Sequence, residues 1–308
     1  MLPWLPYRGA VTEALPDLRW RALEAGHEAR VDAATAGHRA RTAQGRSHPV
    51  EDFLFRYYAH RPAHLRRWHP GAGVRLEGAA DLPRARWRHY RTVGGAVEVD
   101  VEGFLGSRGG AVDAVRGLVS ATLSRPPRLG CFGLHEWAMV YRQPEDEVRH
   151  RGWPLRLGGP GTDAVVEEHE LRCSHVDAFR FFTPPARPRN ALRPTRENQA
   201  VLEQPGCLHA GMDVYKWCFT LTPLVPSSLT VDAFDLAREI RVLDMQASPY
   251  DLRALGYSPV RIETREGRAE YSRRQRDFSG RANVLRRRLL DVLDTADATV
   301  AGTRRAQR

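Results

Sequence analysis

Helical periodicity constrains the fold of this chain more than any other feature. Near the C-terminus one apolar stripe repeats at steps of three and four residues and comprises Phe278, Ala282, Leu285, Leu289 and Val292. A second stripe has the same spacing and comprises Leu236, Ile240, Leu243 and Ala247. Because this spacing places side chains on one face of a helix, both stretches predict amphipathic helices packed against a core.

Two further stretches extend this pattern over most of the chain. Residues 112–123 carry an apolar stripe, and residues 17–44 carry another that includes His27 and His38. Val97–Val101 alternates in the way that predicts a short strand, residues 260–263 could form another, and residues 165–172 fit a strand or a helix. We therefore expect a mainly α fold. An N-terminal arm (1–16) precedes a single helical domain with short strand insertions (17–300), and a disordered basic tail (301–308) follows it.

Several functional classes are excluded by what the sequence lacks. It contains no run of eighteen apolar residues, so no membrane span is expected. No signal-peptide pattern precedes the first predicted helix, and four cysteines in 308 residues are too few for a disulfide framework, so we expect a cytoplasmic protein. Phosphate-binding P-loops, dinucleotide-binding glycine motifs and G-x-S-x-G nucleophile elbows are also missing.

The charge is unevenly distributed along the chain. The formal net charge is +10, and residues 1–127 hold 19 arginines against 13 acids, whereas residues 128–219 hold 12 basic and 12 acidic residues. Residues 265–308 are again basic, with 12 arginines against 6 acids. Basic segments flanking a neutral centre would suit a phosphate-bearing partner, although an arginine-rich composition also gives solvated positive faces without any partner.

The neutral centre contains the residues with the most chemistry. Three segments each contain a cysteine, a histidine, a carboxylate soon after it and then aromatic residues: 130–137, 173–182 and 207–217. Titratable groups among aromatic residues are typical of a reactive pocket. We therefore predict a pocket built from residues 128–252, in which His135, His175 and His209 lie close together around one cavity.

These segments could hold a metal ion. His135, His175, His209 and Asp213 are suitable ligands for iron or zinc, and His209 and Asp213 share one face of a helix. In the competing interpretation, each histidine only orients a neighbouring carboxylate and the cysteines are small buried apolar residues. A metalloenzyme acting on a small molecule is therefore one of the two functions that the sequence leaves open.

The same residues could act on a nucleic-acid base. An enzyme that removes an alkylated purine flips the cationic base into an aromatic cage and uses a carboxylate to orient water. The candidate cage and substrate-binding residues are Trp137, Tyr141, Phe181, Tyr215, Trp217 and the only lysine, Lys216. The candidate catalytic residues are Asp177, Asp213, Glu136, His175 and His209. Aromatic residues at these spacings are also common in an ordinary core.

A family resemblance favours the second function. The runs at 133–141, 175–182, 203–210, 213–217 and 244–252 resemble a family of actinobacterial proteins commonly labelled 3-methyladenine DNA glycosylase. The resemblance implies a DNA-repair hydrolase without a cofactor that binds alkylated duplex DNA. Under this function the basic residues would hold phosphates, with Arg180, Arg281 and Arg287 as candidate phosphate contacts. The chain lacks the L-P-G-x-G and Q-x-Q patterns of known glycosylases, so the resemblance assigns no catalytic residue.

Overall fold

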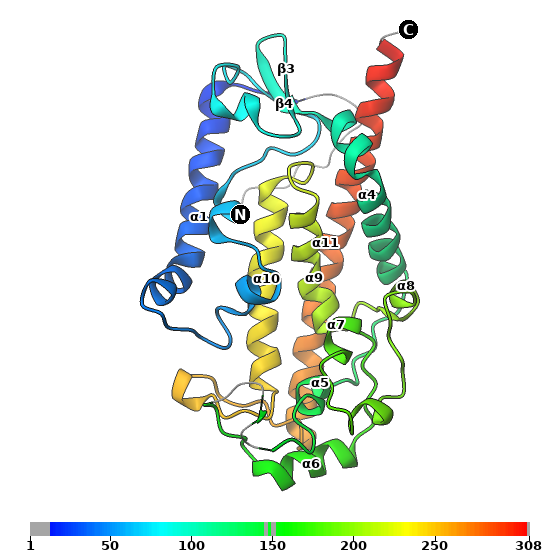
Figure 1. Ribbon diagram of the computed structural model, residues 1–308. Helices are drawn as coiled ribbons and strands as arrows, with labels where there is room; N and C mark the ends of the chain where they lie inside the picture. The colour runs from blue at the N-terminus through cyan, green and yellow to red at the C-terminus, as the bar shows by residue number, and fades with distance from the viewer. Residues whose placement is uncertain (1–12, 145–146, 149–151, 307–308) are drawn as a thin grey trace.

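The computed structural model describes residues 13–144, 147–148 and 152–306 and confirms the mainly α fold (Figure 1). Four helices form the central bundle: α4 (Val101–Leu123), α9 (Leu208–Thr220), α10 (Ser227–Gln246) and α11 (Arg265–Ala306). Helix α10 packs against α9 and α11, and α11 also packs against α4. The predicted stripes supply these contacts, since Ile240 of α10 and Leu289 of α11 are fully buried.

A glycine sets the distance between α9 and α10. A Cβ atom at Gly211 would lie 2.9 Å from the Cδ1 atom of Ile240, which is closer than van der Waals contact. The missing side chain lets the two helices approach along the part of α9 that also carries His209 and Asp213. The close packing therefore fixes the position of both candidate site residues relative to α10.

Helix α1 (Asp17–Ala43) lies outside the bundle and packs against α3 (Pro62–Arg66) and α10. Its two stripe histidines have structural partners. The Nε2 atom of His27 is 2.9 Å from the carbonyl oxygen of Leu65, and the Nδ1 atom of His38 is 2.9 Å from a carboxylate oxygen of Asp52. These histidines therefore help to hold α1 against neighbouring segments of the chain.

A small sheet covers one end of the bundle (Figure 1). Its strands are β1 (Glu13–Leu15), β2 (Val74–Leu76), β3 (Tyr90–Val93) and β4 (Ala96–Val99), in the order β1-β2-β4-β3. Strand β1 pairs in parallel with β2, whereas the other pairs are antiparallel. The predicted N-terminal arm is therefore wrong for residues 13–15, which pair into the sheet, and residues 1–12 lie outside the described part of the chain.

Short helices surround the opposite end of the bundle and position the candidate site. They are α2 (Phe53–Tyr57), α5 (Leu134–Ala138), α6 (Gly158–Glu168), α7 (Val176–Phe179) and α8 (Gln199–Leu202). Single 3₁₀ turns occur at Pro83–Arg86, Arg187–Arg189 and Arg253–Leu255. In Figure 1, α5 and α7 lie beside the ends of α9 and α10 that point away from the sheet.

The last helix is longer than its apolar stripe predicts. Helix α11 continues to Ala306, so the predicted disordered tail is wrong for residues 301–306, and residues 307–308 lie outside the described part. The stripe ends earlier because the last turns of α11 extend beyond the bundle (Figure 1). Among the helices described, none has the length and apolar character needed to cross a membrane.

Candidate functional site

The first part of the site joins α5 to α10. Gly133, in a left-handed conformation, starts α5 and is followed by His135 and Glu136, which are both buried. The Nε2 atom of His135 is 2.8 Å from the Oδ1 atom of Asp244, whose Oδ2 atom accepts a hydrogen bond from Arg241 at 2.6 Å. Arg241 also donates to Glu136 at 2.8 Å.

This network determines the charge of Asp244. Burial alone would raise the pKa of Asp244, but His135 and Arg241 outweigh burial and hold that pKa far below its usual range. Asp244 is therefore an ionised carboxylate in the interior. Such charges are costly to bury unless they are paired or coordinate a metal ion.

The second part of the site joins α7 to α9. His175 precedes α7, and its Nε2 atom lies 3.2 Å from the Oδ2 atom of Asp213 and 3.9 Å from the Oε2 atom of Glu203. The Tyr58 hydroxyl donates to the other oxygen of Asp213 at 2.6 Å, and Gln199 donates to Glu203 at 2.8 Å. Each oxygen of Asp213 therefore faces a different partner.

The charges in this second part are coupled. Burial opposes ionisation of Asp213, but His175, Lys216 and Tyr58 together lower its pKa to about 2. Burial likewise opposes protonation of His175, yet the bond to Asp213 raises the pKa of His175 overall. The pKa of Glu203 is raised, chiefly by burial. His175 and Asp213 thus form an imidazolium–carboxylate pair.

The three histidines lie side by side, as predicted from the repeated Cys-His signature. The ring centroids of His135 and His209 are 4.6 Å apart, and those of His175 and His209 are 5.2 Å apart. Within the described residues, the ring of His209 contacts these two imidazoles and makes no hydrogen bond. Burial lowers the pKa of His209 well below its usual range, so its imidazole is neutral and has a free lone pair.

The site therefore contains two groups of metal-ligand type. His135, His209 and Asp244 have ligand atoms that lie within 4.8 Å of one another, and the same holds for His175, Glu203 and Asp213. We call these groups the His-His-Asp triad and the His-Glu-Asp triad. The sequence predicts four of these six residues, and it assigns His209 and Asp213 to one site, whereas the structure places them in different triads.

A cavity of about 310 Å³ adjoins the His-His-Asp triad. His209, Glu136 and Arg241, which are all buried, are among the residues that line it. The other lining residues are His48, Pro49, Phe53, Arg56, Tyr57, Met139, Asp177, Arg180 and Phe181. The pocket is therefore not confined to residues 128–252 as predicted, because the segment from His48 to Tyr57 forms one wall.

Asp177 lies between several basic groups. It accepts a hydrogen bond from Arg196, and its carboxylate oxygens lie 3.6 Å from the Nε atom of Arg180 and 3.6 Å from the Nζ atom of Lys216. Lys216 is also 4.0 Å from Asp213 and lies 4.4 Å from the centroid of the Trp217 ring. Lys216 thus links the two predicted carboxylates.

Most of the predicted aromatic cage belongs to the core. Trp137 and Tyr215 are fully buried, and the Trp137 indole donates to the carbonyl oxygen of Ala247. The Tyr141 hydroxyl donates to Glu167 at 2.7 Å. Phe181 lines the cavity, and so do Phe53 and Tyr57, which sequence reasoning missed because they come from a distant segment.

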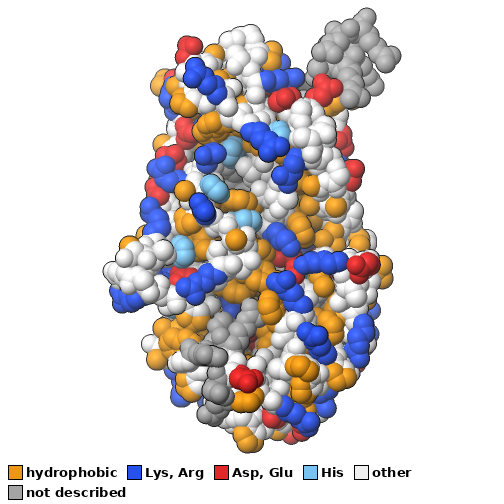
Figure 2. Space-filling view, viewed as in Figure 1, with side chains coloured by type: hydrophobic (Ala, Val, Ile, Leu, Met, Phe, Trp, Pro, Cys, Tyr) orange, Lys and Arg blue, Asp and Glu red, His pale blue; other side chains and the backbone are white. Residues whose placement is uncertain are grey.

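The predicted phosphate contacts lie on different elements. Arg180 is at the cavity, whereas Arg281 and Arg287 lie on α11, where Arg281 forms an ion pair with Glu239 at 2.7 Å. Figure 2 shows Lys and Arg side chains spread over the visible face, with acidic and apolar side chains between them. The three predicted arginines therefore come from two different elements, and their phosphate contacts stay a prediction.

Comparison with protein-family models, curated proteins and solved structures finds no match to this chain. The chemistry of the site is therefore argued from its own residues and geometry.

Proposed function

We propose that the protein is a metal-dependent enzyme that acts on a small organic anion. The observation that carries this proposal is the pair of adjacent buried triads, one of which contains His209, a cavity-lining imidazole without a hydrogen-bond partner among the described residues. Two histidines and one carboxylate are a donor set typical of catalytic iron and zinc. The His-Glu-Asp triad is a candidate for a second ion beside it.

The surrounding residues provide what such a centre needs. Metal ligands are usually oriented by further hydrogen bonds, and here Arg241 holds Asp244, Tyr58 holds Asp213 and Gln199 holds Glu203. An iron or zinc ion in the His-His-Asp triad would supply Lewis acidity next to the cavity. Glu136 lines the same cavity, directly follows the ligand His135 in the chain and is held by Arg241. It is therefore a candidate to accept or donate a proton.

The cavity walls indicate the kind of substrate. Phe53, Tyr57 and Phe181 provide flat apolar surfaces, and Arg56 and Arg180 bring positive charge to the same space. A volume of about 310 Å³ is within the size range of small-molecule sites. We therefore expect a planar organic anion, with its ring against the aromatic residues and its charge near the arginines.

Metal content of protein purified without a histidine tag tests this proposal. We expect stoichiometric iron or zinc by elemental mass spectrometry, and its loss in His209→Ala and Asp244→Asn. His64→Ala is the control, because His64 is an exposed histidine on α3. Circular dichroism would verify that the variants fold. Metal-free wild-type protein that also fails to take up added iron or zinc would refute the proposal.

A second candidate is hydrolysis of the glycosidic bond of an alkylated purine in DNA. One observation favours it, namely that Asp177 and Glu136 line the same cavity as Phe181 and Tyr57. Aromatic rings attract a cationic base, and a carboxylate offsets the positive charge that develops on the sugar. The assay is release of 3-methyladenine from alkylated DNA, which Asp177→Asn should abolish. DNA binding that is as strong at high salt as at low salt would contradict this function.

A further inference from the structure

A second cavity, of about 370 Å³, lies beside the start of α5. Its lining residues come from three stretches of the chain, namely 128–134, 169–174 and 192–204. We call it the Arg128 cavity. Its volume is within the range of sites for small organic molecules. The apolar part of its wall consists of Phe132, Leu134, Leu192 and Leu202.

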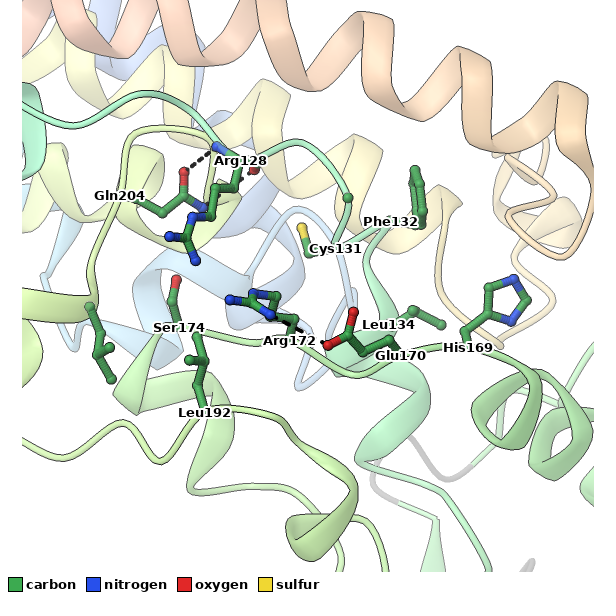
Figure 3. Close-up of a pocket in the computed structure, with 12 residues that line it drawn as sticks. Arg128, Cys131, Phe132, Leu134, His169, Glu170, Arg172, Ser174, Leu192 and Gln204 are labelled. Atoms are coloured by element: carbon green, nitrogen blue, oxygen red, sulfur yellow. Dashed lines mark hydrogen bonds and ion pairs between the residues drawn. The ribbon is translucent and has the colours of Figure 1, made fainter.

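Two arginines bring positive charge to the Arg128 cavity. Arg128 and Arg172 both line it, and both are exposed. Arg172 lies 3.4 Å from Glu170, but both side chains are largely in water, where such a pair is weak. The Arg128 guanidinium makes no ion pair or hydrogen bond with any described residue. In Figure 3 both guanidinium groups point toward the same part of the cavity, and Glu170 lies beyond Arg172 as seen from Arg128.

The backbone at Arg128 is fixed even though its side chain is unpaired. The Oε1 atom of Gln204 accepts a hydrogen bond from the Arg128 amide at 2.8 Å, and the Nε2 atom of Gln204 donates to the Arg128 carbonyl at 3.4 Å. Gln204 is itself buried. A Cβ atom at Gly206 would clash with the same carbonyl oxygen, so the chain packs closely there. An arginine on such a fixed base loses less freedom when it binds a ligand than one on a mobile loop.

A buried hydroxyl adds a third hydrogen-bond donor to the Arg128 cavity. Ser174 lines the cavity and is only 7% exposed. Its hydroxyl makes no hydrogen bond with any described residue. In Figure 3 this hydroxyl points toward the Arg128 guanidinium. A buried hydroxyl without a partner is unfavourable, so a ligand oxygen at this position would satisfy Ser174 and both arginines together.

We propose that the Arg128 cavity binds a small organic molecule through a phosphate group. A phosphate monoester carries nearly two negative charges at neutral pH, which match the two guanidinium groups. Its oxygens accept the forked N–H groups of arginine and the hydroxyl of Ser174. The apolar wall would contact the organic part. The residues that hold this ligand differ from those of the metal-ligand triads, so the proposal does not rest on the proposed function.

Isothermal titration calorimetry with phenyl phosphate tests this site. We expect one equivalent to bind, and to bind more tightly than inorganic phosphate because the phenyl ring contacts the apolar wall. Benzoate, with a single charge, should bind more weakly. Arg128→Ala and Arg172→Ala should each weaken binding of phenyl phosphate by at least about tenfold, and Ser174→Ala by about two- to tenfold.

The matched control is Arg19→Ala. Arg19 is an exposed arginine on α1 whose side chain has no partner among the described residues, so this variant loses the same charge without touching the cavity. Arg128 and Arg172 are also exposed, so their loss should leave the fold intact, which circular dichroism checks. An equal weakening in Arg19→Ala and Arg128→Ala would mean that phenyl phosphate responds only to net charge and would overturn the proposal.

Further arms of the titration separate the Arg128 cavity from other places that could take phosphate. Binding should persist after dialysis against a chelator and in Arg180→Ala, because a metal ion or the cavity beside the His-His-Asp triad could also attract phosphate. Loss of binding in either case would overturn the proposal. A short DNA duplex that displaces phenyl phosphate would assign the cavity to nucleic acid instead. No saturable binding, or benzoate that binds as tightly as phenyl phosphate, would also contradict a phosphate site.

Discussion

The two ends of the bundle bury charge in different ways. At the sheet end, Arg84 is buried among three indole rings, with its Cζ atom 5.0 Å from the ring centroids of both Trp68 and Trp87, and it pairs with Glu24. At the site end, Arg241 lies 3.9 Å from the centroid of the Phe53 ring and pairs with Glu136 and Asp244. Both arginines are almost fully buried.

The difference between these ends lies in the partners. Glu24 keeps 27% of its side chain exposed, so water can still solvate it, whereas Glu136 and Asp244 are buried. At the site end a cavity is lined by Arg241 and by its partner Glu136. A buried arginine therefore does not by itself indicate a functional site. Several buried carboxylates beside a cavity are the stronger indication.

The largest effect should come from removing each arginine. Arg241→Met leaves the buried Glu136 without its ion-pair partner and Asp244 with His135 alone, and we expect the free energy of unfolding to fall by about 3–5 kcal/mol. Arg84→Met should cost about 1–2 kcal/mol, mainly from the lost cation–π contacts. Urea unfolding at pH 7 measures both. An equal loss of stability in the two variants would show that the ends do not bury charge differently. Arg281→Met is the control, because it breaks the exposed ion pair between Arg281 and Glu239.

Two tyrosines provide a finer comparison. The Tyr58 hydroxyl donates to the ionised Asp213 at 2.6 Å, and the Tyr90 hydroxyl lies 2.8 Å from the Nδ1 atom of His69 at the sheet end. Hydrogen bonds to charged groups contribute more than those between neutral groups. We therefore expect Tyr58→Phe to lower the free energy of unfolding by about 1.5–3 kcal/mol and Tyr90→Phe by about 1 kcal/mol.

Each tyrosine variant has a direct check. Chemical denaturation of metal-free protein measures both losses. Tyr215→Phe is the matched control at the site end, because the Tyr215 hydroxyl is buried without a hydrogen-bond partner among the described residues. Removing this hydroxyl should leave the free energy of unfolding unchanged or raise it slightly. If Tyr58→Phe is as mild as Tyr215→Phe, Asp213 does not depend on the Tyr58 hydroxyl.

Local sequence patterns predict the bundle well because helix packing depends on near neighbours in the chain. The stripe containing Ile240 and Leu243 places one face of α10 in the core, as the structure confirms. Strand β1 was missed because three residues are too few to show an alternating pattern. Its pairing with β2 depends on a contact between residues far apart in the sequence.

The site was only partly predictable for the same reason. The repeated Cys-His-carboxylate signature predicts the three histidines and Asp213. Asp244 and Arg241 instead lie on α10, outside the three Cys-His segments, and directly follow the apolar stripe residues Leu243 and Ile240. Their burial results from contacts with α5, more than a hundred residues earlier in the chain. A charged residue next to a stripe is the only local sign of such a contact.

Two histidines with oppositely shifted pKa values, one at each end, should make opposite pH-dependent contributions to the free energy of unfolding. Burial, with nearby Arg84, lowers the pKa of His69 to about 3. The folded protein then resists a proton that the unfolded chain accepts below pH 6.5, so His69 destabilises the fold as the pH falls. In metal-free protein the pKa of His175 is raised, so its stabilising contribution is complete below pH 6.5 and is lost as the pH rises through the raised value.

Unfolding free energies of His69→Gln and His175→Gln between pH 5 and pH 9 measure this difference. Relative to wild type, His69→Gln should gain about 1.4 kcal/mol on going from pH 7.5 to pH 5.5, because it no longer resists a proton. His175→Gln should recover part of its deficit as the pH rises above 6.5. Only the pH-dependent part counts, so a constant loss of packing does not affect the result. Parallel slopes in the two variants would mean that Asp213 does not hold His175 in its charged form.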